Sequence, residues 1–490
     1  MISKQRPVMQ LSDLAADLVA IPAHVADLWV TGVTADSRVA GPGDVFVAIP
    51  GTKADGGRFI ADAEAKGAIA AFAAQTAAVP AGLAIPVLRV PDPRVALAVL
   101  ASRVYRGQPA TVVAITGTSG KTSVAEFTRQ IFAACGHQAA SLGTIGVVSP
   151  KATVYGSLTT PDPVTLHKTL AALATEGTTH LAMEASSHGL DQHRLDGVGI
   201  AAAAFTNLGR DHLDYHPTVE DYFAAKMRLF ENLLPPDKPA VINRDGAYAA
   251  EAEAIARRTG RPVLTVGRSG ETIKLVSAEA AGFAQRLTLQ ASGKMAAVEL
   301  PLVGGYQVEN ALVAAGLAIA TGEEVERVFA ALPGLKGVKG RLEVIGRRNG
   351  GLGVVDYAHK PEALAAALEA CRPFATGRLI CVFGCGGDRD RGKRPIMGRI
   401  AVEKSDVVIV TDDNPRTETA PAIRAEVLSG AKGAIEIGDR AEAIRTAVAM
   451  MQPGDVVLVA GKGHETGQIV GDTVLPFSDH DVLAEALGAP

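Results

Sequence analysis

The sequence predicts an α/β fold with mostly parallel sheets, divided into three domains. The chain has 490 residues, which is too long for one hydrophobic core, and roughly three domains are expected at this length. Short apolar runs alternate with helical patterns over most of the chain. Such alternation is typical of parallel sheets with helices on both faces.

Two glycine-containing stretches, residues 106–109 and 334–341, are candidate linkers between domains. They predict an N-terminal α/β substrate domain (1–107), a central domain resembling P-loop ATPases with a mostly parallel sheet (108–338), and a C-terminal Rossmann-like α/β domain (339–490). Within the first domain, the alanine-rich stretch near residues 61–79 predicts a helix.

Short β-branched or alanine-rich runs predict the strands of the two larger domains. The central strands are expected at 112–116, 180–184, 201–207 and 240–243, and the C-terminal ones at 353–357, 379–384, 406–411 and 455–461. Several runs end in glycine or a polar residue. In open parallel sheets, ligand-binding loops occupy this edge.

Composition excludes several classes of protein. Hydrophobic residues make up 48% of the chain, and the net charge of −4 argues against nucleic acid or an anionic membrane as the main partner. The N-terminus lacks a signal-peptide pattern, and no run approaches the ~20 apolar residues of a membrane span. The four cysteines (Cys135, Cys371, Cys381 and Cys385) form no disulfide or zinc-site pattern. We expect a cytoplasmic protein with its thiols in cores and loops.

A glycine-rich turn after the strand at 112–116 predicts a nucleotide triphosphate site. The turn runs through Gly117, Thr118, Ser119, Gly120, Lys121, Thr122 and Ser123 into a helix. Glycines allow backbone N–H groups to surround phosphate oxygens, Lys121 adds a positive charge, and the Thr122 hydroxyl can reach Mg²⁺. Isoleucine occupies position 115, where the usual motif has its first glycine. A structural strand-to-helix turn is the less favoured alternative.

Polar clusters follow the next two central strands. Glu184 ends one strand, where a carboxylate can bind Mg²⁺. A lone glutamate there would be more simply a solvated loop acid, but the Ser-Ser-His and Gln-His-Arg segments that follow favour a site. Arg210, Asp211, His212, Asp214 and His216 follow the other strand and suggest a metal site, although such residues also line loops. In the amphipathic helix at 222–230, Lys226 is most simply a surface lysine with a packed stem.

The C-terminal domain carries two cationic loops, at 384–395 and 412–416. Asp413, Asn414 and Arg416 together could recognise a zwitterion, since the acid accepts from an ammonium and the guanidinium binds a carboxylate. The alternative is an Asx-Pro turn with incidental charges. The segment from Gly461 to Glu465 is a further ligand-loop candidate.

These segments together resemble the Mur ligase family. The resemblance rests on Thr-Gly-Thr-Ser-Gly-Lys-Thr at 116–122, Glu-Ala-Ser-Ser-His-Gly-Leu at 184–190, Arg-Asp-His-Leu-Asp-Tyr-His at 210–216, Val-Asp-Tyr-Ala-His at 355–359 and Gly-Lys-Gly-His-Glu at 461–465. It covers nearly the whole chain. Within the family, Asp-Asn-Pro-Arg at 413–416 is similar to a diaminopimelate-recognition motif.

The resemblance implies an ATP-dependent amide ligase of cytoplasmic peptidoglycan precursor synthesis. It would join meso-2,6-diaminopimelate to UDP-N-acetylmuramoyl-L-alanyl-D-glutamate through an acyl phosphate, with Mg²⁺ as cofactor. A monomer is expected, with no nucleic-acid partner and no membrane insertion. Phosphoryl transfer depends mainly on positioning and charge neutralisation.

The resemblance also assigns site residues. The catalytic set is Lys121, Glu184, His212 and Lys226. Mg²⁺ would be held by Thr122, Glu184, His212 and Lys226, the last as an N6-carboxylysine carbamate. ATP would contact 117–123 together with Asn310, Arg341, Asp356 and His359. The nucleotide-linked substrate would contact Ala35, Ser37, Thr52, Lys53, Ala54, Thr159, Thr160, Ser186, Gln192 and Arg194. Diaminopimelate would contact Arg389, Asp413, Asn414, Pro415, Arg416, Gly461 and Glu465.

Two departures and four alternatives remain. Leu158 stands where a polar residue is expected, and Ser119 stands where many relatives have asparagine. Close alternatives are a lysine-adding enzyme or a folylpolyglutamate-type ligase, against which the 413–416 motif and the 34–51 segment argue. A P-loop ATPase without an amino-acid acceptor would leave the C-terminal cationic loops unexplained. A catalytically silent paralogue would not need the set Lys121, Thr122, Glu184, His212 and Lys226.

Overall fold

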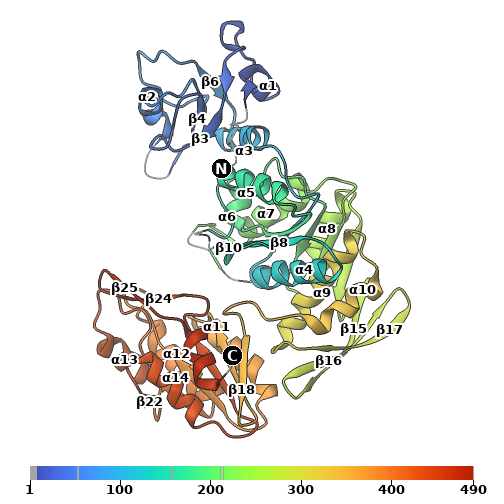
Figure 1. Cartoon of the computed structure of the whole chain (residues 1–490), viewed down its shortest axis with the longest axis vertical. Helices are drawn as coiled ribbons and strands as arrows, with labels where there is room; N and C mark the ends of the chain where they lie inside the picture. Colours follow the sequence, from blue (N-terminus) through green and yellow to red (C-terminus); the bar gives the residue numbers. More distant parts are fainter. Residues whose placement is uncertain are drawn as a thin grey trace. The chain divides into compact units, whose positions relative to one another are not determined.

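The computed structural model describes residues 8–51, 55–154, 156, 158–209, 211–212 and 215–488, and it has the expected α/β character (Figure 1). Its contacts divide the chain into two compact units. The first runs to Lys121 and resumes over Phe132–Leu264 and Ala320–Gly322. The second comprises Thr122–Ile131, Thr265–Ile319 and the chain from Glu323 onward. Three sheets of four or more strands follow one another along the sequence.

The N-terminal part of the first unit is a parallel four-stranded sheet in the order β3-β4-β5-β6. Its strands are β3 (Gly32–Thr34), β4 (Asp44–Ala48), β5 (Ala70–Ala74) and β6 (Val87–Val90), its helices are α1 (Leu11–Ala15), α2 (Ile60–Ala65) and α3 (Pro93–Val104), and β1 (Met9–Gln10) pairs with β2 (Trp29–Val30). Side chains from α1, α3 and the strands share one core.

The helix expected near residues 61–79 is wrong over most of its length. Helix α2 ends at Ala65, and the alanines of 70–74 form the buried strand β5. Gly67, at φ +102°, stops the helix in a backbone conformation that other residues rarely adopt. The helical propensity of alanine is weak compared with the burial of a strand between two neighbours, so tertiary packing decides.

A second sheet begins in the first unit in the order β10-β9-β8-β11-β7-β12-β13, and the order continues through β14 to β15-β16-β17. The bounds are β7 (Thr111–Thr116), β8 (Ala139–Gly143), β9 (Gly146–Val148), β10 (Thr153–Val154), β11 (His180–Glu184), β12 (Ala202–Phe205), β13 (Ala240–Asn243) and β14 (Val263–Gly267). The helices are α4 (Lys121–Ala134), α5 (Pro163–Thr175), α6 (Ser187–Asp191), α7 (Val219–Arg228) and α8 (Ala249–Arg258). The predicted central strands are confirmed.

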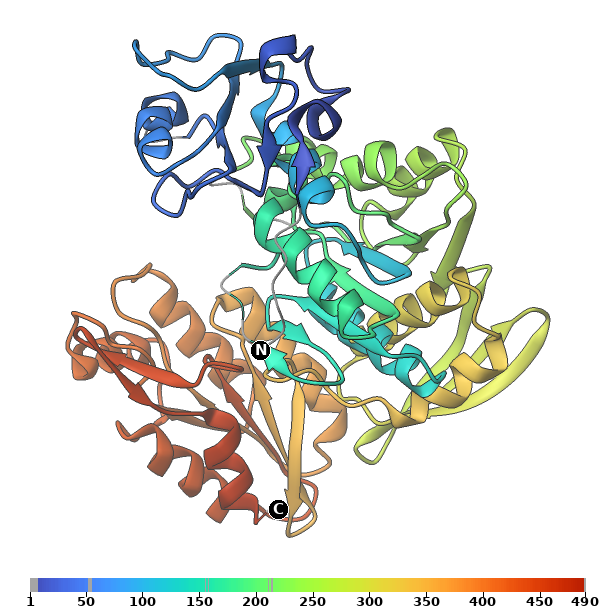
Figure 2. The same ribbon diagram turned by 45° about the horizontal axis from the view of Figure 1, so that its top comes forward.

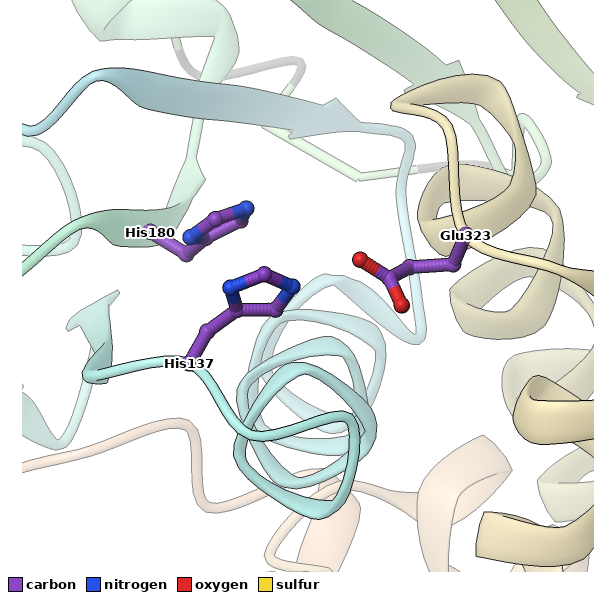
Figure 3. Close-up of side chains that lie close together, drawn as sticks. All are labelled: His137, His180 and Glu323. Atoms are coloured by element: carbon purple, nitrogen blue, oxygen red, sulfur yellow. The ribbon is translucent and has the colours of Figure 1, made fainter.

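Register in this sheet brings three strand ends to one edge. Parallel β11 and β12 flank β7, with Glu184 opposite Ile115 and Phe205 opposite Thr116. The segments that follow these strands carry the predicted phosphate loop, the Glu184 motif and the His212 motif. At the opposite end of β11 the rings of His137 and His180 stack, with their centroids 3.8 Å apart. Figure 3 shows the two rings.

The second unit contains three antiparallel strands and a separate six-stranded sheet (Figure 2). The first three are β15 (Ile273–Ala281), β16 (Ala284–Ala291) and β17 (Lys294–Leu300), followed by α9 (Gly305–Ala320) and α10 (Val325–Ala331). The six-stranded sheet has the order β18-β19-β23-β20-β21-β22, with only β18 antiparallel to its neighbour.

Helices cover both faces of the six-stranded sheet, as a Rossmann-like arrangement requires. Its strands are β18 (Glu343–Arg348), β19 (Gly351–Asp356), β20 (Leu379–Phe383), β21 (Val407–Val410), β22 (Ile435–Glu436) and β23 (Val456–Ala460). One core contains side chains of α11 (Pro361–Cys371), α12 (Lys393–Lys404) and α13 (Ala420–Leu428), and the other contains those of α14 (Arg440–Ala449) and α15 (Asp479–Leu487). The hairpin of β24 (Gly467–Val470) and β25 (Thr473–Pro476) follows β23.

The cysteine and membrane expectations can be compared with this structure. All four cysteines are free and buried, as predicted from their spacing. Burial raises the pKa of the Cys381 and Cys385 thiols to about 12. Over the described residues, no helix combines the length and apolar character needed to cross a membrane.

Candidate active site

The phosphate loop is fixed by the strand beside it. Gly117 has φ +147°, and a Cβ there would lie 1.9 Å from Thr206 Oγ1, so only glycine fits without displacement. The Thr118 N–H donates to the Asn207 carbonyl at 2.9 Å, and the Ser119 N–H donates to Asn207 Oδ1 at 3.0 Å. The loop is thus held in place, and Thr122 and Ser123 lie in the first turn of α4, where helix N–H groups attract anions.

Two lysines meet at this loop. Lys121 Nζ and Lys226 Nζ each donate to the Gly117 carbonyl oxygen at 2.8 Å. Lys226 is only 1% exposed, so its interpretation as a surface lysine is wrong. Burial, with the nearby charge of Lys121, holds the pKa of Lys226 well below its usual value. At a given pH, the neutral amine is therefore favoured more strongly in Lys226 than in a solvent-exposed lysine.

Helix α7 buries Lys226 because one helical face packs inward. Tyr222, Ala225 and Met227 are buried with it, and Thr218 caps the helix by accepting from the Asp221 N–H. The ammonium lies 4.3 Å from the centre of the Tyr222 ring, whose hydroxyl is 3.1 Å from Thr118 Oγ1. Tyr222 therefore links α7 to the phosphate loop.

Glu184 is a buried residue at the end of β11, which excludes the alternative of a solvated loop acid. Its Oε1 accepts from the Thr144 N–H at 2.7 Å, and its Oε2 accepts from the Thr144 hydroxyl at 3.3 Å. These bonds orient the carboxylate. A buried, oriented carboxylate is the kind of hard oxygen ligand that Mg²⁺ prefers.

The predicted contacts to the peptide part of the substrate form one hydrogen-bonded group around Thr160. The Thr160 hydroxyl donates to the Glu184 carbonyl at 2.9 Å and accepts from the Ser186 N–H at 3.0 Å. Arg194 Nη1 donates to the Thr160 carbonyl at 2.7 Å and Nη2 to Gln192 Oε1 at 2.7 Å. The Thr159 hydroxyl lies 3.0 Å from that of Thr144, which connects this group to Glu184. Leu158 is exposed, as a ligand-facing position could be.

His212 lies at the surface of the same region. Its side chain is 46% exposed and its φ is +54°. The ring lies 4.8 Å from that of His188 and 6.1 Å from that of Tyr222. The neighbouring Arg210 and Asp214 of the predicted cluster lie outside the described residues.

A cavity of about 880 Å³ lies beside β3. Its lining combines the 31–36 segment, including Ala35, with Asp162, Val164, Thr165 and Lys168 from the start of α5. Ser37 directly follows that segment but is outside the lining. Thr52, Lys53 and Ala54, the other predicted contacts to the nucleotide sugar, lie outside the described residues.

Four residues outside the phosphate loop are expected to contact adenosine. All four lie in the second unit. Asn310 donates to Gln307 Oε1 at 2.9 Å, and Gln307 donates to the Arg341 carbonyl at 3.1 Å. Asp356 Oδ2 accepts from the Leu342 N–H at 2.7 Å, and burial raises the pKa of Asp356 to about 6. His359 Nδ1 lies 2.8 Å from the Tyr357 carbonyl, and burial lowers the pKa of His359.

The predicted amino-acid site lies after β21 and β23. Asp413 and Asn414 are 7% and 4% exposed, whereas Arg389 is exposed. Arg416 has φ +52°, and its Nη1 donates to the Gly387 carbonyl at 2.9 Å. Asn414 Nδ2 donates to Glu465 Oε2 at 2.9 Å. A Cβ on Gly461 would lie 2.7 Å from Asp413 Oδ2, so the two loops approach closely there.

Sequence reasoning missed several residues that hold these sites together. Asn207 and Tyr222 fix the phosphate loop, Gln307 connects Asn310 to Arg341, and Gln468 donates to the Asp413 carbonyl at 2.7 Å. Asn207 carried a usable signal, since it ends a predicted strand at the ligand edge. The others contact residues distant in sequence, and no local pattern marks them.

This fold and site can now be compared with known proteins. Three family descriptions match the chain: the Mur ligase family catalytic domain over 30–105, the Mur ligase middle domain over 115–318, and the Mur ligase glutamate ligase domain over 340–463. The chain is therefore an ATP-dependent, amide-forming ligase. It belongs to the Mur ligase family.

Two relatives of similar length carry the name of one particular ligase of this family. A protein of Bradyrhizobium diazoefficiens, named UDP-N-acetylmuramoyl-L-alanyl-D-glutamate–2,6-diaminopimelate ligase, is 58% identical, with 98% of this chain and 99% of the relative covered. A Caulobacter vibrioides protein of the same name is 51% identical, over 94% and 96%. These relatives place the chain among the ligases of peptidoglycan precursor synthesis.

Solved structures agree with the fold. One of a ligase with the same name has a TM-score of 0.75 at 33% identity and covers 98% of this chain and 99% of its own. A MurF ligase of Thermotoga maritima in complex with ADP has a TM-score of 0.60 at 21% identity, with 93% and 96% covered. The second likeness supports the fold alone.

Proposed function

We propose that this ligase joins meso-2,6-diaminopimelate to the D-glutamyl carboxylate of UDP-N-acetylmuramoyl-L-alanyl-D-glutamate. The observation that carries the proposal is the segment 413–416, where Arg416 is fixed by the Gly387 carbonyl and Asn414 is fixed by Glu465. A guanidinium and a carboxylate near each other suit an amino acid with a second carboxylate and ammonium. The names of the relatives at 51–58% identity point the same way.

The chemistry follows from two nucleophilic steps. The substrate carboxylate attacks the γ-phosphorus of ATP, giving an acyl phosphate and ADP. A neutral amine of diaminopimelate then attacks the acyl carbon, and the tetrahedral intermediate collapses to the amide with loss of phosphate and a proton. Lys121 and the N–H groups of 117–123 would neutralise and orient the phosphates.

Mg²⁺ would be held by Thr122, Glu184, His212 and a modified Lys226, and would neutralise phosphate charge. The fit rests on the oriented carboxylate of Glu184 and on the lowered pKa of buried Lys226. A neutral amine nitrogen can add to the carbon of CO₂, releasing a proton and forming an anionic carbamate. This converts a cation that repels a metal into an oxygen ligand.

The nucleotide sugar would occupy the cavity beside β3. The cavity measures about 880 Å³, and its lining reaches from Ala35 to Lys168. That volume falls within the range usual for small-molecule sites. We also propose that the protein acts in the cytoplasm, since ATP and nucleotide-linked precursors are cytoplasmic substrates. We propose further that it is a monomer, as the family resemblance implies.

Phosphate release from ATP tests the proposal. The full chain is incubated with the nucleotide-linked dipeptide and, separately, with meso-diaminopimelate, L-lysine or no amino acid. Release with diaminopimelate alone, together with the tripeptide product, is expected. Release with lysine would retain the ligase and overturn the proposed specificity. Equal release without an amino acid would favour an ATPase.

A further inference from the structure

The buried cation Lys462, in the loop after β23, has no role in the reaction as described so far. Its side chain is 0% exposed. Its Nζ donates to Asn414 Oδ1 at 2.9 Å and to Glu465 Oε2 at 3.0 Å, and it lies 3.9 Å from Asp413 Oδ1. All three partners belong to the proposed diaminopimelate site, so the ammonium lies directly beneath that site.

Lys462 determines which way the Asn414 amide faces. Asn414 Oδ1 accepts from Lys462 Nζ and from the Ile469 N–H, both at 2.9 Å. Its Nδ2 donates to Glu465 Oε2 at 2.9 Å. A reversed amide would direct its NH₂ group at two donors, which hydrogen bonding disfavours. Both bonds to Glu465 end on Oε2, which leaves Oε1 as the oxygen that can face a substrate ammonium.

A neighbouring buried cation shows what a purely structural pair looks like. Arg440 is also fully buried, and it binds both carboxylate oxygens of Asp479, at 2.7 and 2.8 Å. Its remaining bonds go to the backbone carbonyls of Asp412 and Ala460. Arg440 therefore carries its own counterion, whereas the bonds of Lys462 all end on side chains of the proposed binding segment.

We propose that Lys462 is a positioning residue that sets the amino-acid specificity of this ligase. It orients Asn414 and Glu465 and balances the negative charge of Asp413 and Glu465. Without it, Asp413 and Glu465 would lose the cation that contacts both of them. Lysine, which has one fewer carboxylate than diaminopimelate, would then be discriminated less. The inference rests on the proposed function, since it concerns the same amino-acid site.

The variant Lys462→Met tests this role, since methionine is also unbranched but has no charge or donor. We expect KM for diaminopimelate to rise at least about tenfold and the preference over L-lysine to fall. KM for ATP and for the nucleotide-linked dipeptide should stay near the wild-type values. The control is Arg378→Met, which breaks the 2.6 Å pair of Arg378 with buried Asp455 at the other end of β20 and β23. It should lose stability without any change in amino-acid preference.

Each outcome is decisive. If Lys462→Met behaves like Arg378→Met, with lower thermal stability and an unchanged KM for diaminopimelate, Lys462 is structural and the inference is wrong. If Lys462→Met does not fold, Lys462→Gln tests the charge alone, since its amide keeps a donor for Asn414. The preference for diaminopimelate over L-lysine should still fall, and an unchanged preference would overturn the inference. If the wild-type protein itself shows no diaminopimelate-dependent phosphate release, the proposed function fails, independently of Lys462.

Discussion

Lys226 and Lys121 donate to the same backbone oxygen, that of Gly117, although they lie on different helices. Two ammonium groups so close repel each other, and burial removes the water that would screen them. Burial, together with this repulsion, holds the pKa of Lys226 well below its usual value. A lowered pKa favours the neutral amine, which is the form that the proposed carbamate requires.

Replacing Lys226 with alanine should reduce ligase activity by about 10²-fold or more, as expected when an aligned charge is removed from a phosphoryl-transfer site. Short carboxylic acids added to Lys226→Ala should restore part of the activity by occupying the position of the carbamate. Phosphate release measures both effects. Lys404→Ala, which removes a lysine paired with Glu369 elsewhere, is the control. Full activity of Lys226→Ala, or no rescue, would contradict the carbamate.

The lowered pKa of Lys226 also predicts a pH dependence of stability. The folded protein releases this proton at a lower pH than the unfolded chain does, so between the two pKa values the unfolded chain binds more protons. The free energy of unfolding should therefore rise with pH in that window, by up to about 1.4 kcal/mol per pH unit. Denaturant titrations in CO₂-free buffer should show this slope for the wild type and a smaller one for Lys226→Met. Equal slopes would show that Lys226 does not titrate abnormally.

Asp356 should give the opposite slope. Burial raises its pKa from 3.8 to about 6, so the folded state keeps a proton that the unfolded chain has lost. The free energy of unfolding should therefore fall by up to about 3 kcal/mol as the pH rises from below 3.8 to above about 6. Asp356→Asn keeps an oxygen for the Leu342 N–H and should remove this loss. Unfolding of both proteins near pH 4 and pH 7 measures it, and parallel curves would refute the prediction.

Substitutions of Arg416 can separate the loss of diaminopimelate binding from the cost of backbone strain at this position. Its φ of +52° is costly for alanine and easy for glycine, so Arg416→Gly should be more stable than Arg416→Ala by about 1 kcal/mol. Both should lose ~10³-fold or more in kcat/KM for diaminopimelate, with ATP binding retained. Equal losses of amino-acid use and ATP binding would indicate a structural role for the side chain instead. Arg416→Lys should also be impaired, because an ammonium lacks the bidentate geometry.

The cavity beside β3 can be filled to test the nucleotide-sugar site. Thr165 lines this cavity from the first turn of α5. Thr165→Trp should raise KM for the nucleotide-linked substrate at least about tenfold and leave ATP binding unchanged, since a bulky side chain excludes a ligand from a formed pocket. Thr175→Trp, at the exposed end of the same helix, is the matched control. Equal KM values for the two variants would place the substrate elsewhere.

Much of the fold could be predicted because its signals are local. The strands at 112–116 and 379–384 are apolar runs bounded by turn residues, and both appear as buried parallel strands, β7 and β20. The phosphate loop follows from the glycine-rich run at 117–123 directly after the first of these strands. Such features depend on neighbours along the chain, and the sequence displays them directly.

The errors and omissions have a common cause in long-range packing. Residues 70–74 favour a helix by composition, but two flanking strands bury them as β5. Lys226 resembles any lysine on an amphipathic helix until Gly117, 109 positions away, becomes its acceptor. Lys462 and its partner Asn414 are 48 positions apart. The residue types of the site could be recognised from the sequence, whereas the buried bonds that orient them could not.

The burial of all four cysteines has a practical consequence for following this enzyme in solution. Covered thiols react slowly with maleimides, and the raised pKa values of Cys381 and Cys385 slow those two further, because the thiolate is the nucleophile. The natural sequence should therefore give almost no labelling background. A pair of cysteines introduced at exposed sites, one in each compact unit, can carry fluorophores without first removing the native thiols. Energy transfer between the two dyes would then report the distance between the units as each substrate is added.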